Sequence, residues 1–424
     1  MADLVRITVL WHRDCAEGRD LAAEIFRWFR GDPNDPGEAG RGIPVQYRCF
    51  PEEPPGAGDA GAAARVEIAV ALVDEHMVVD PRWRGYLMSA VKPRVRLLVP
   101  VALDATAYQL PFAINRLNFL RLDRAVDPDT WGWEERSHVR RERLVSLLTQ
   151  VIARELLALA GADDPSQRGL PPPQITVFIS HAKADGVQEA EAVRSAILGS
   201  GQMRAFYDES DLPIGYAFAQ RLEDAAGRGG AVETQAMVVI YSDSYPTRPW
   251  CQRELRLART PQRRAATGPG AHCWRVKPMV IAASLTGAET RMLGEVGQAP
   301  HIAWDPARVG RVVDLLLREI LLLRYNDERA LELLKKPDEP DHSADGDAAA
   351  KDEDRQAGRH ALNCIPDLYT AMEIRHACAG TLTELLIPPP GLPREDREML
   401  GRLMSDGDEP VAITTFDDAE LMRK

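Results

Sequence analysis

The chain has 424 residues, of which 45% are hydrophobic and 27% are charged, and its formal net charge is -12. Its composition is that of an ordinary globular protein, which excludes a collagen-like or wholly disordered chain, and its length allows about two to four domains. The acidic balance argues against binding to nucleic acid or to an anionic membrane, because surfaces of like charge repel one another.

Six cysteines are scattered along the chain without the close spacings of zinc sites or thioredoxin-like redox pairs. The amino-terminal residues reach charged side chains too early for a secretory signal, and the longest apolar runs fall short of the ~20 residues that a membrane span needs. We therefore expect a cytoplasmic protein without a metal site and without a membrane partner.

Two segments interrupt the apolar pattern. Residues 161–173 end in three prolines, which favour extended backbone, and predict a linker. Residues 336–358 hold eight acidic and three basic side chains and no large apolar one, so they predict a flexible acidic tether. A metal-binding acidic run is the alternative, but the carboxylates lack EF-hand spacing. These breaks predict domains at residues 1–160 and 174–330 and a small module at 359–424.

The two large pieces predict the same order of elements, which indicates an internal duplication. The first has expected strands in residues 7–11, 42–50, 66–78, 95–103 and 117–122 and a last helix in residues 144–160. The second has expected strands in residues 175–180, 201–209, 236–246, 276–284 and 299–304 and a last helix in residues 312–325.

These strands lack polar alternation, and apolar patterns at helical spacing separate them. This is typical of a parallel sheet that helices cover on both faces. We therefore expect the α/β class, with tandem flavodoxin-like domains of five parallel strands that bind ligands at the carboxyl ends of the strands. Residues 359–424 predict a small α/β module with helices at 365–377 and 392–404 and a strand at 381–388, which we interpret as a docking or assembly module.

Three motifs of the second piece resemble the TIR (Toll/interleukin-receptor) family. They are VFISHAKAD at residues 177–185, FYDESDLPIG at 206–215 and VVIYSDSYPTRPWCQREL at 238–255, and they fall in the family's order. In family members that cleave NAD, the glutamate of the last motif is the essential carboxylate, which the resemblance places at Glu254. The remaining substrate-binding residues that the resemblance implies are Phe178 and Ser180 at the first strand, Asp208, Leu212 and Gly215 in a mobile loop, and Ser242 and Trp250 in the pocket wall.

The residues around Glu254 also predict a local structure. Pro249 suits a first helical turn, and Cys251, Leu255 and Ala258 then form a stripe that faces the sheet. Glu254 and Trp250, four residues apart, share the neighbouring edge of this helix.

Simpler interpretations of these side chains remain open. Glu254 could be a solvated surface charge and Trp250 a packing anchor. His181 could be a general base, but it is better interpreted as a loop residue. A nucleophilic Cys251 is rejected, because this side chain points toward the core and lacks a histidine nearby in sequence.

The resemblance implies an NAD+ glycohydrolase that releases nicotinamide and yields ADP-ribose or cyclic ADP-ribose, with NAD+ as substrate and no cofactor. It also implies a homo-oligomer through TIR–TIR contacts, switched on by an activating protein or second messenger in bacterial anti-phage defence. The alternatives are a non-catalytic scaffold that acts through homotypic TIR contacts and a transferase that joins ADP-ribose to another base.

The first piece departs from the family pattern. If Trp83 aligns with Trp250, Leu87 stands where the second copy has Glu254, and the loop after its second strand lacks the Leu-Pro-x-Gly form. We therefore expect a degenerate TIR-like domain without activity, which would hold oligomers together, contact an activator or occlude the active copy.

Overall fold

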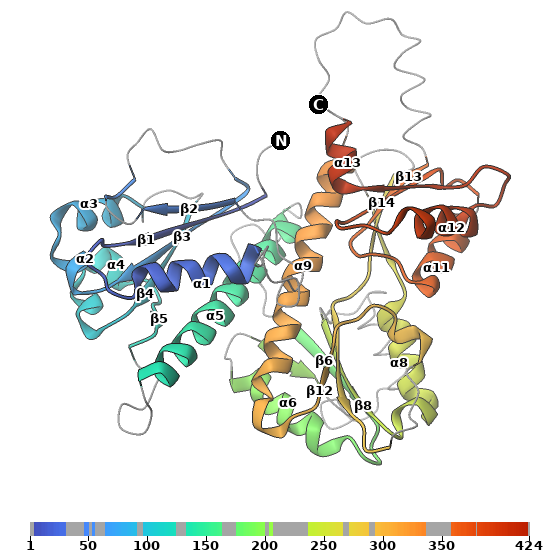
Figure 1. Ribbon diagram of the computed structural model, residues 1–424, viewed down its shortest axis with the longest axis horizontal. Coiled ribbons are helices and arrows are strands. Elements are labelled where there is room, and N and C mark those ends of the chain that lie inside the picture. The colour runs from blue at the N-terminus through green and yellow to red at the C-terminus, as the bar shows by residue number, and fades with distance from the viewer. Residues whose placement is uncertain are drawn as a thin grey trace, which may run out of the picture. The chain divides into compact units, whose positions relative to one another are not determined.

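The computed structural model describes residues 4–30, 46–50, 53–55, 64–90, 96–123, 133–162, 175–199, 203–206, 236–265, 271–287, 293–335, 358–378 and 380–422. Contacts divide the chain into two compact units, Met1–Leu156 and Leu157–Lys424. The described residues form three five-stranded sheets with helices packed against them, which confirms the predicted α/β class (Figure 1).

The first unit contains one parallel sheet with the strand order β2-β1-β3-β4-β5. Its strands are β1 (Val5–Trp11), β2 (Gln46–Phe50), β3 (Val66–Val73), β4 (Arg96–Ala102) and β5 (Leu120–Arg121). Its helices are α1 (Gly18–Arg30), α2 (Glu75–Val79), α3 (Pro81–Ala90), η2 (Ala105–Gln109), α4 (Phe112–Asn115) and α5 (Trp133–Ala162). Helices α2, α3 and α4 lie on one side of the sheet and α1 and α5 on the other (Figure 1), so apolar side chains are buried on both faces.

The second unit begins with another parallel sheet, with the order β12-β11-β8-β6-β7. Its strands are β6 (Ile175–His181), β7 (Met203–Phe206), β8 (Ala236–Ser242), β11 (Met279–Ser284) and β12 (His301–Ala303). Its helices are α6 (Val187–Gly199), η5 (Tyr245–Thr247), α8 (Pro249–Arg259), η6 (Gly294–Val296), η7 (Pro306–Arg308) and α9 (Gly310–Leu334). The strands of each sheet can be numbered one to five in the order in which they occur along the chain. Their order across the sheet is then 2-1-3-4-5 in both sheets, which is the flavodoxin-like order predicted from the sequence.

The third sheet brings together two distant parts of the chain. It has the order β15-β14-β13-β10-β9, with β9 antiparallel to β10 and the other strands parallel. Its strands are β9 (Gln262–Ala265), β10 (His272–Arg275), β13 (Arg359–Leu362), β14 (Glu384–Ile387) and β15 (Ala412–Thr415). Its carboxyl-terminal helices are α11 (Leu368–Cys378), α12 (Arg394–Met404) and α13 (Phe416–Leu421).

The module expected at residues 359–424 therefore does not stand apart. Its helices and β14 lie where the sequence predicts them, but β9 and β10, between α8 and β11, supply two of the five strands. The physical reason is size, because three strands of four residues bury too little apolar surface to form a core alone. Of the linker expected at 161–173, the first two residues are the end of α5 and the others lie outside the described residues. The tether expected at 336–358 lies outside them too, except for residue 358.

Helix α9 is long enough, at about 37 Å, to serve two cores. It packs on β8 and β11 of the second sheet and on β10 and β13 of the third. Ala330, Leu333 and Leu334 join Phe416 in one buried cluster on the third sheet. Among the described residues, no helix combines the length and the apolar character needed to cross a membrane.

The shared core predicts that the carboxyl-terminal segment stabilises the whole second unit. Phe416 is fully buried beside α9, so Phe416→Ala should lower the free energy of unfolding by about 3–5 kcal/mol. Urea denaturation followed by tryptophan fluorescence measures this change.

Phe112→Ala is the matched control, because this phenylalanine is 78% exposed and its loss should alter stability by less than about 0.5 kcal/mol. An unchanged transition in Phe416→Ala would contradict the shared core.

Candidate active site

Helix α8 carries the predicted catalytic glutamate. Arg248 precedes it in an extended conformation, and Pro249 occupies its first turn, as expected. Cys251, Leu255 and Ala258 are buried in a cluster with residues of β6, β8 and β11, so the predicted stripe does face the sheet.

Glu254 is buried more deeply than its position on the helix edge suggests. It is 7% exposed, whereas Trp250, one turn earlier, is 51% exposed. The Trp250 ring instead faces the Arg253 guanidinium, whose carbon lies 5.5 Å from the ring centroid. Trp250 is thus not a core packing anchor, and Glu254 is not a solvated surface charge.

A short chain of hydroxyl groups reaches Glu254 from the carboxyl end of β6. Ser180, which is 1% exposed, donates from its hydroxyl to Glu254 Oε2 at 2.5 Å. The Tyr245 hydroxyl lies 2.8 Å from Ser180 Oγ and 3.3 Å from the Cys251 carbonyl oxygen. Strand β6, the turn η5 and helix α8 therefore meet at this one carboxyl group.

The number of protons shared by Glu254, Ser180 and Tyr245 depends on the ionisation of Glu254. When Glu254 is a carboxylate, only the two hydroxyl groups carry a proton. They can form two of the three contacts, Glu254–Ser180, Ser180–Tyr245 and Tyr245–Cys251 carbonyl, so the third has no donor. When Glu254 is protonated, it can donate to Ser180, Ser180 to Tyr245, and Tyr245 to the Cys251 carbonyl, so every contact has a donor. The site thus accommodates both protonation states by reversing the direction of its hydrogen bonds.

Burial raises the pKa of Glu254 to about 7, and the hydrogen bond from Ser180 acts in the opposite direction. A carboxyl group of this kind changes charge near neutral pH, which suits a catalytic role. Burial also raises the pKa of Tyr245 well above its ordinary value, so Tyr245 remains a neutral phenol.

Cys251 does not have the environment of an activated nucleophile. Burial raises the pKa of the Cys251 thiol to about 12, which leaves it protonated and unreactive. The Cys251 thiol donates a hydrogen bond to the backbone carbonyl oxygen of His181, at 3.5 Å. Rejection of Cys251 as a nucleophile agrees with this environment.

Two aspartates connect the loops at this edge of the sheet. Asp185 accepts hydrogen bonds from the Ser242 hydroxyl at 2.6 Å and from the Ser244 backbone N–H at 2.9 Å. Asp243 accepts hydrogen bonds from the backbone N–H groups of Thr286 and Gly287, at 3.1 and 3.0 Å. The ends of β6, β8 and β11 are thereby fixed relative to one another.

The structure brings together some of the sequence-predicted residues. Ser180 contacts Glu254 directly, and Phe178 is buried in the same cluster as α8. Ser242 is 2% exposed and faces Asp185. The expected loop residues Asp208, Leu212 and Gly215 lie outside the described residues.

Tyr245 and Asp185 take part in the hydrogen bonds of this candidate site, although sequence reasoning does not single them out. Both lie inside the quoted motifs, so their positions are visible, but nothing in the sequence indicates which hydroxyl or carboxylate turns inward.

Residues 177–272 match the family model described as TIR domain, and this range includes Ser180, Tyr245 and Glu254. The chain therefore contains a TIR domain. No curated protein matches the chain. The match begins within β6 and ends at the start of β10, so the TIR signature itself extends into the third sheet.

The first unit corrects one alignment made from the sequence. In α3, Trp83 and Leu87 are fully buried, whereas Trp250 of the TIR domain is exposed, so Trp83 does not correspond to Trp250. Pro81 instead matches Pro249 at the helix start, and the buried positions of α3 then match Cys251, Leu255 and Ala258 in α8. Tyr86, not Leu87, therefore takes the position of Glu254.

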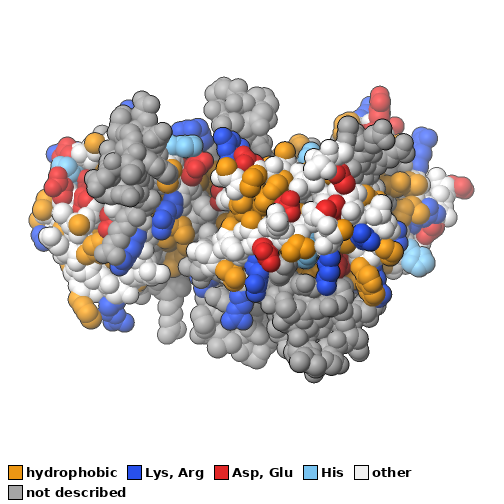
Figure 2. All heavy atoms as spheres, turned by 90° about the horizontal axis from the view of Figure 1, so that it is seen from below, with side chains coloured by type: hydrophobic (Ala, Val, Ile, Leu, Met, Phe, Trp, Pro, Cys, Tyr) orange, Lys and Arg blue, Asp and Glu red, His pale blue; other side chains and the backbone are white. Residues whose placement is uncertain are grey.

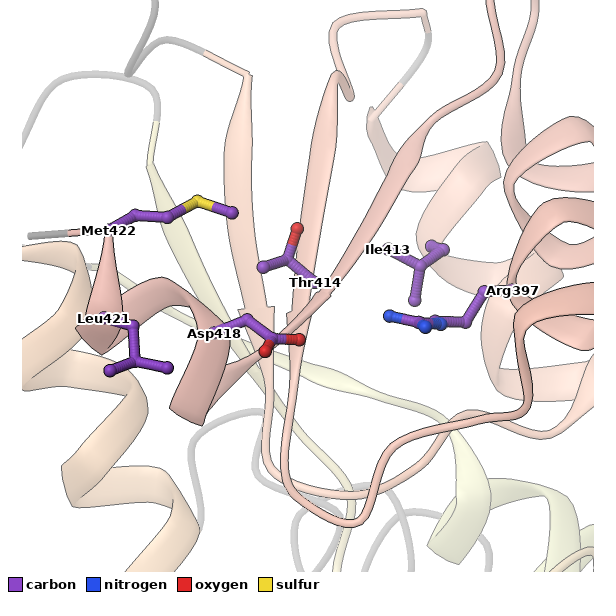
Figure 3. A pocket seen from close by; sticks show the side chains of 6 residues that line it. All are labelled: Arg397, Ile413, Thr414, Asp418, Leu421 and Met422. Carbon is purple, nitrogen blue, oxygen red and sulfur yellow. The ribbon is translucent and has the colours of Figure 1, made fainter.

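A hollow of about 420 Å³ lies away from this site. It is lined by residues of α12, β15 and α13, namely Arg397, Ile413, Thr414, Asp418, Leu421 and Met422 (Figure 3). Within the part of the chain that the structure describes, no group of three or more histidine, cysteine, aspartate or glutamate side chains could hold a metal ion.

The raised pKa of Glu254 predicts a stability change with pH. Between pH 4.5 and 7 the folded state keeps a proton that the unfolded chain releases, so burial of Glu254 lowers the free energy of unfolding by up to about 3 kcal/mol as the pH rises through this window. The glutamine of Glu254→Gln does not ionise, so its free energy of unfolding does not fall for this reason. Relative to the wild type, the variant should therefore gain stability progressively from pH 4.5 to 7.

Urea unfolding at several pH values measures the difference. Glu191→Gln, an exposed position on α6, serves as control and should show no such trend. A constant difference between wild type and Glu254→Gln across this window would contradict the assignment.

Proposed function

We propose that the TIR domain cleaves the nicotinamide–ribose bond of NAD+, with Glu254 as the catalytic carboxylate. The observation that carries this proposal is the contact of buried Glu254 with Ser180 at the carboxyl end of β6, because parallel sheets of this order bind ligands at that edge. The TIR family includes members that cleave NAD, and the essential glutamate of those members corresponds to Glu254.

The chemistry of the bond fits such a site. Nicotinamide leaves as a neutral molecule and needs little help from an acid, while positive charge develops on the ribose. A carboxylate in a site that excludes water stabilises this charge more strongly than one in bulk solvent. Ser180 engages Oε2, which leaves Oε1 to accept a hydrogen bond from a ribose hydroxyl.

The charge of the surface does not oppose a nucleotide anion. Five of the twelve net negative charges belong to residues 336–358, and acidic and basic side chains are interspersed on the face that Figure 2 shows. We also propose the cytoplasmic location, the products ADP-ribose or cyclic ADP-ribose, and activation by self-association in response to an activating protein or second messenger. The products, the activation and a role in anti-phage defence rest on family resemblance, and the location rests on the scattered cysteines and short apolar runs of the sequence.

The first unit would then be a TIR-like partner without activity. Its sheet has the strand order of the TIR domain, but Tyr86 occupies the place of the glutamate. A phenol with an ordinary pKa near 10 does not supply a negative charge at neutral pH.

Glu254→Gln tests the proposal directly. It should lower nicotinamide release from NAD+ by about 100- to 1,000-fold, because the neutral amide cannot stabilise the developing charge. Concentrated protein is incubated with NAD+, and chromatography separates nicotinamide, ADP-ribose and any transfer product.

Glu191→Gln should release nicotinamide at the wild-type rate. Equal release by wild type and Glu254→Gln would remove Glu254 from its role. A wild-type protein that self-associates but releases no nicotinamide would favour the scaffold function.

The pH dependence of kcat gives a second test. Because the carboxylate is the active form, activity should rise with pH through about 7. Ser180→Ala removes the hydrogen bond that favours the charged form, so the midpoint should move up by about 1–2 pH units. Ser195→Ala, at an exposed position on α6, should leave the midpoint unchanged, and an unmoved midpoint in Ser180→Ala would contradict the role of Ser180.

A further inference from the structure

The helix that carries Glu254 ends in a buried ion pair with the carboxyl-terminal segment. Arg259, in the last turn of α8, pairs through its guanidinium with the carboxylate of Asp367, just before α11. Their side chains are 6% and 11% exposed. The other oxygen of Asp367 accepts a hydrogen bond from the Thr370 backbone N–H at 2.7 Å, so one carboxylate joins α8 to the start of α11.

A glycine in the loop after η6 lies tightly against this pair. Gly297 has a φ of 55°, in the left-handed region that favours glycine. A Cβ atom at this position would collide with the Asp367 carboxylate and lie 3.2 Å from the Arg259 guanidinium. The pair is therefore enclosed by α8, α11 and the loop after η6.

The backbone reinforces the same connection. Helix α8 ends at Arg259, and after Thr260 and Pro261 the chain enters β9 of the third sheet. The Thr260 hydroxyl also lies 3.5 Å from the Tyr369 hydroxyl. The carboxyl end of α8 thus contacts the third sheet and its helix α11 through covalent and non-covalent links.

These contacts act on a rigid element that holds the catalytic group. Glu254 lies five residues before Arg259, about 7.5 Å along the helix axis. The hydrogen bond between Ser180 and Glu254 requires a narrow range of distances, so a shift or rotation of α8 would break it. A misplacement of about 1 Å in a catalytic group can lower kcat by about 100-fold.

We propose that Asp367 is a positioning residue for Glu254. Through Arg259 it holds α8 in the orientation in which Glu254 meets Ser180, and residues 358–422 are part of the catalytic unit rather than a separate docking module. This inference rests on the proposed NAD+ cleavage, but its central claim concerns the placement of Glu254 and can be measured without activity.

Asp367→Asn in the full chain is the principal test. The amide can still accept the hydrogen bond from Thr370 but carries no charge for Arg259. Nicotinamide release should fall about 10- to 100-fold in kcat with little change in KM. The midpoint of the pH profile should also move, because Glu254 leaves the environment that raises its pKa.

Asp406→Asn is the matched control. It removes the ion pair between Asp406 and Arg375 of α11, at 2.8 Å, which does not involve α8. It should keep the wild-type kcat and pH profile. Arg259→Lys keeps the charge and should retain more activity than Arg259→Gln. A purely structural role would change the melting temperature and the amount of folded enzyme but not the pH midpoint.

The placement of Glu254 can also be tested if the protein does not cleave NAD+. The stability difference between the wild type and Glu254→Gln is measured from pH 4.5 to 7, and the same difference is measured again with Asp367→Asn present in both proteins. A smaller trend with pH in the Asp367→Asn pair supports positioning of Glu254. The inference is overturned if Asp367→Asn keeps the wild-type kcat and pH midpoint, or if the stability trend with pH is unchanged. The proposed NAD+ cleavage by Glu254 is overturned by a different result, equal turnover by the wild type and Glu254→Gln.

Discussion

Glu254 is withdrawn from water at the place where β6, η5 and α8 meet, and a carboxylate in such surroundings requires a hydrogen-bond donor close by. Ser180 supplies this donor, Tyr245 supports Ser180, and the apolar stripe of α8 holds the backbone that brings the three groups together. Asp185 and Asp243 then fix the surrounding loops. These contacts keep the ionisable Glu254 side chain buried and hydrogen-bonded at the carboxyl end of β6.

The sequence predicts the repeated sheets well, because strands that are apolar on both faces have few alternatives to a helix-covered parallel sheet. It also predicts helix α8 and its apolar stripe, because a helical period is a local property. It does not predict that Glu254 is buried, since Trp250 on the same helix edge is exposed and only the tertiary position of Ser180 distinguishes them. For the same reason the sequence pairs Leu87 rather than Tyr86 with Glu254, because the buried faces of α3 and α8 become comparable only after folding.

The third sheet lies beyond local patterns. Strands β9 and β10 are short and contain several polar side chains, so they lack the apolar runs that mark the other sheets. Strand β13, the partner of β10, comes much later in the chain, and the Trp274–His360 hydrogen bond joins residues 86 positions apart. Arg264 pairs with Glu328, and Asn326 donates to the Asn363 carbonyl oxygen, in a buried polar region of α9 between the two cores. Such contacts determine how α9 packs against β9 and the segment after β13, because a buried polar group without a partner would lower the stability of the fold.

The position of Asp367 has a consequence for how the protein is made. Arg259 leaves the ribosome 108 residues before its partner, and strands β14 and β15 of the third sheet follow later still. During synthesis, folding proceeds from the amino terminus, so the nascent TIR domain contains Glu254 long before α8 has its ion pair. The interrupted order of the fold thus makes the ion pair of α8 depend on synthesis of the carboxyl-terminal strands and helices of the third sheet.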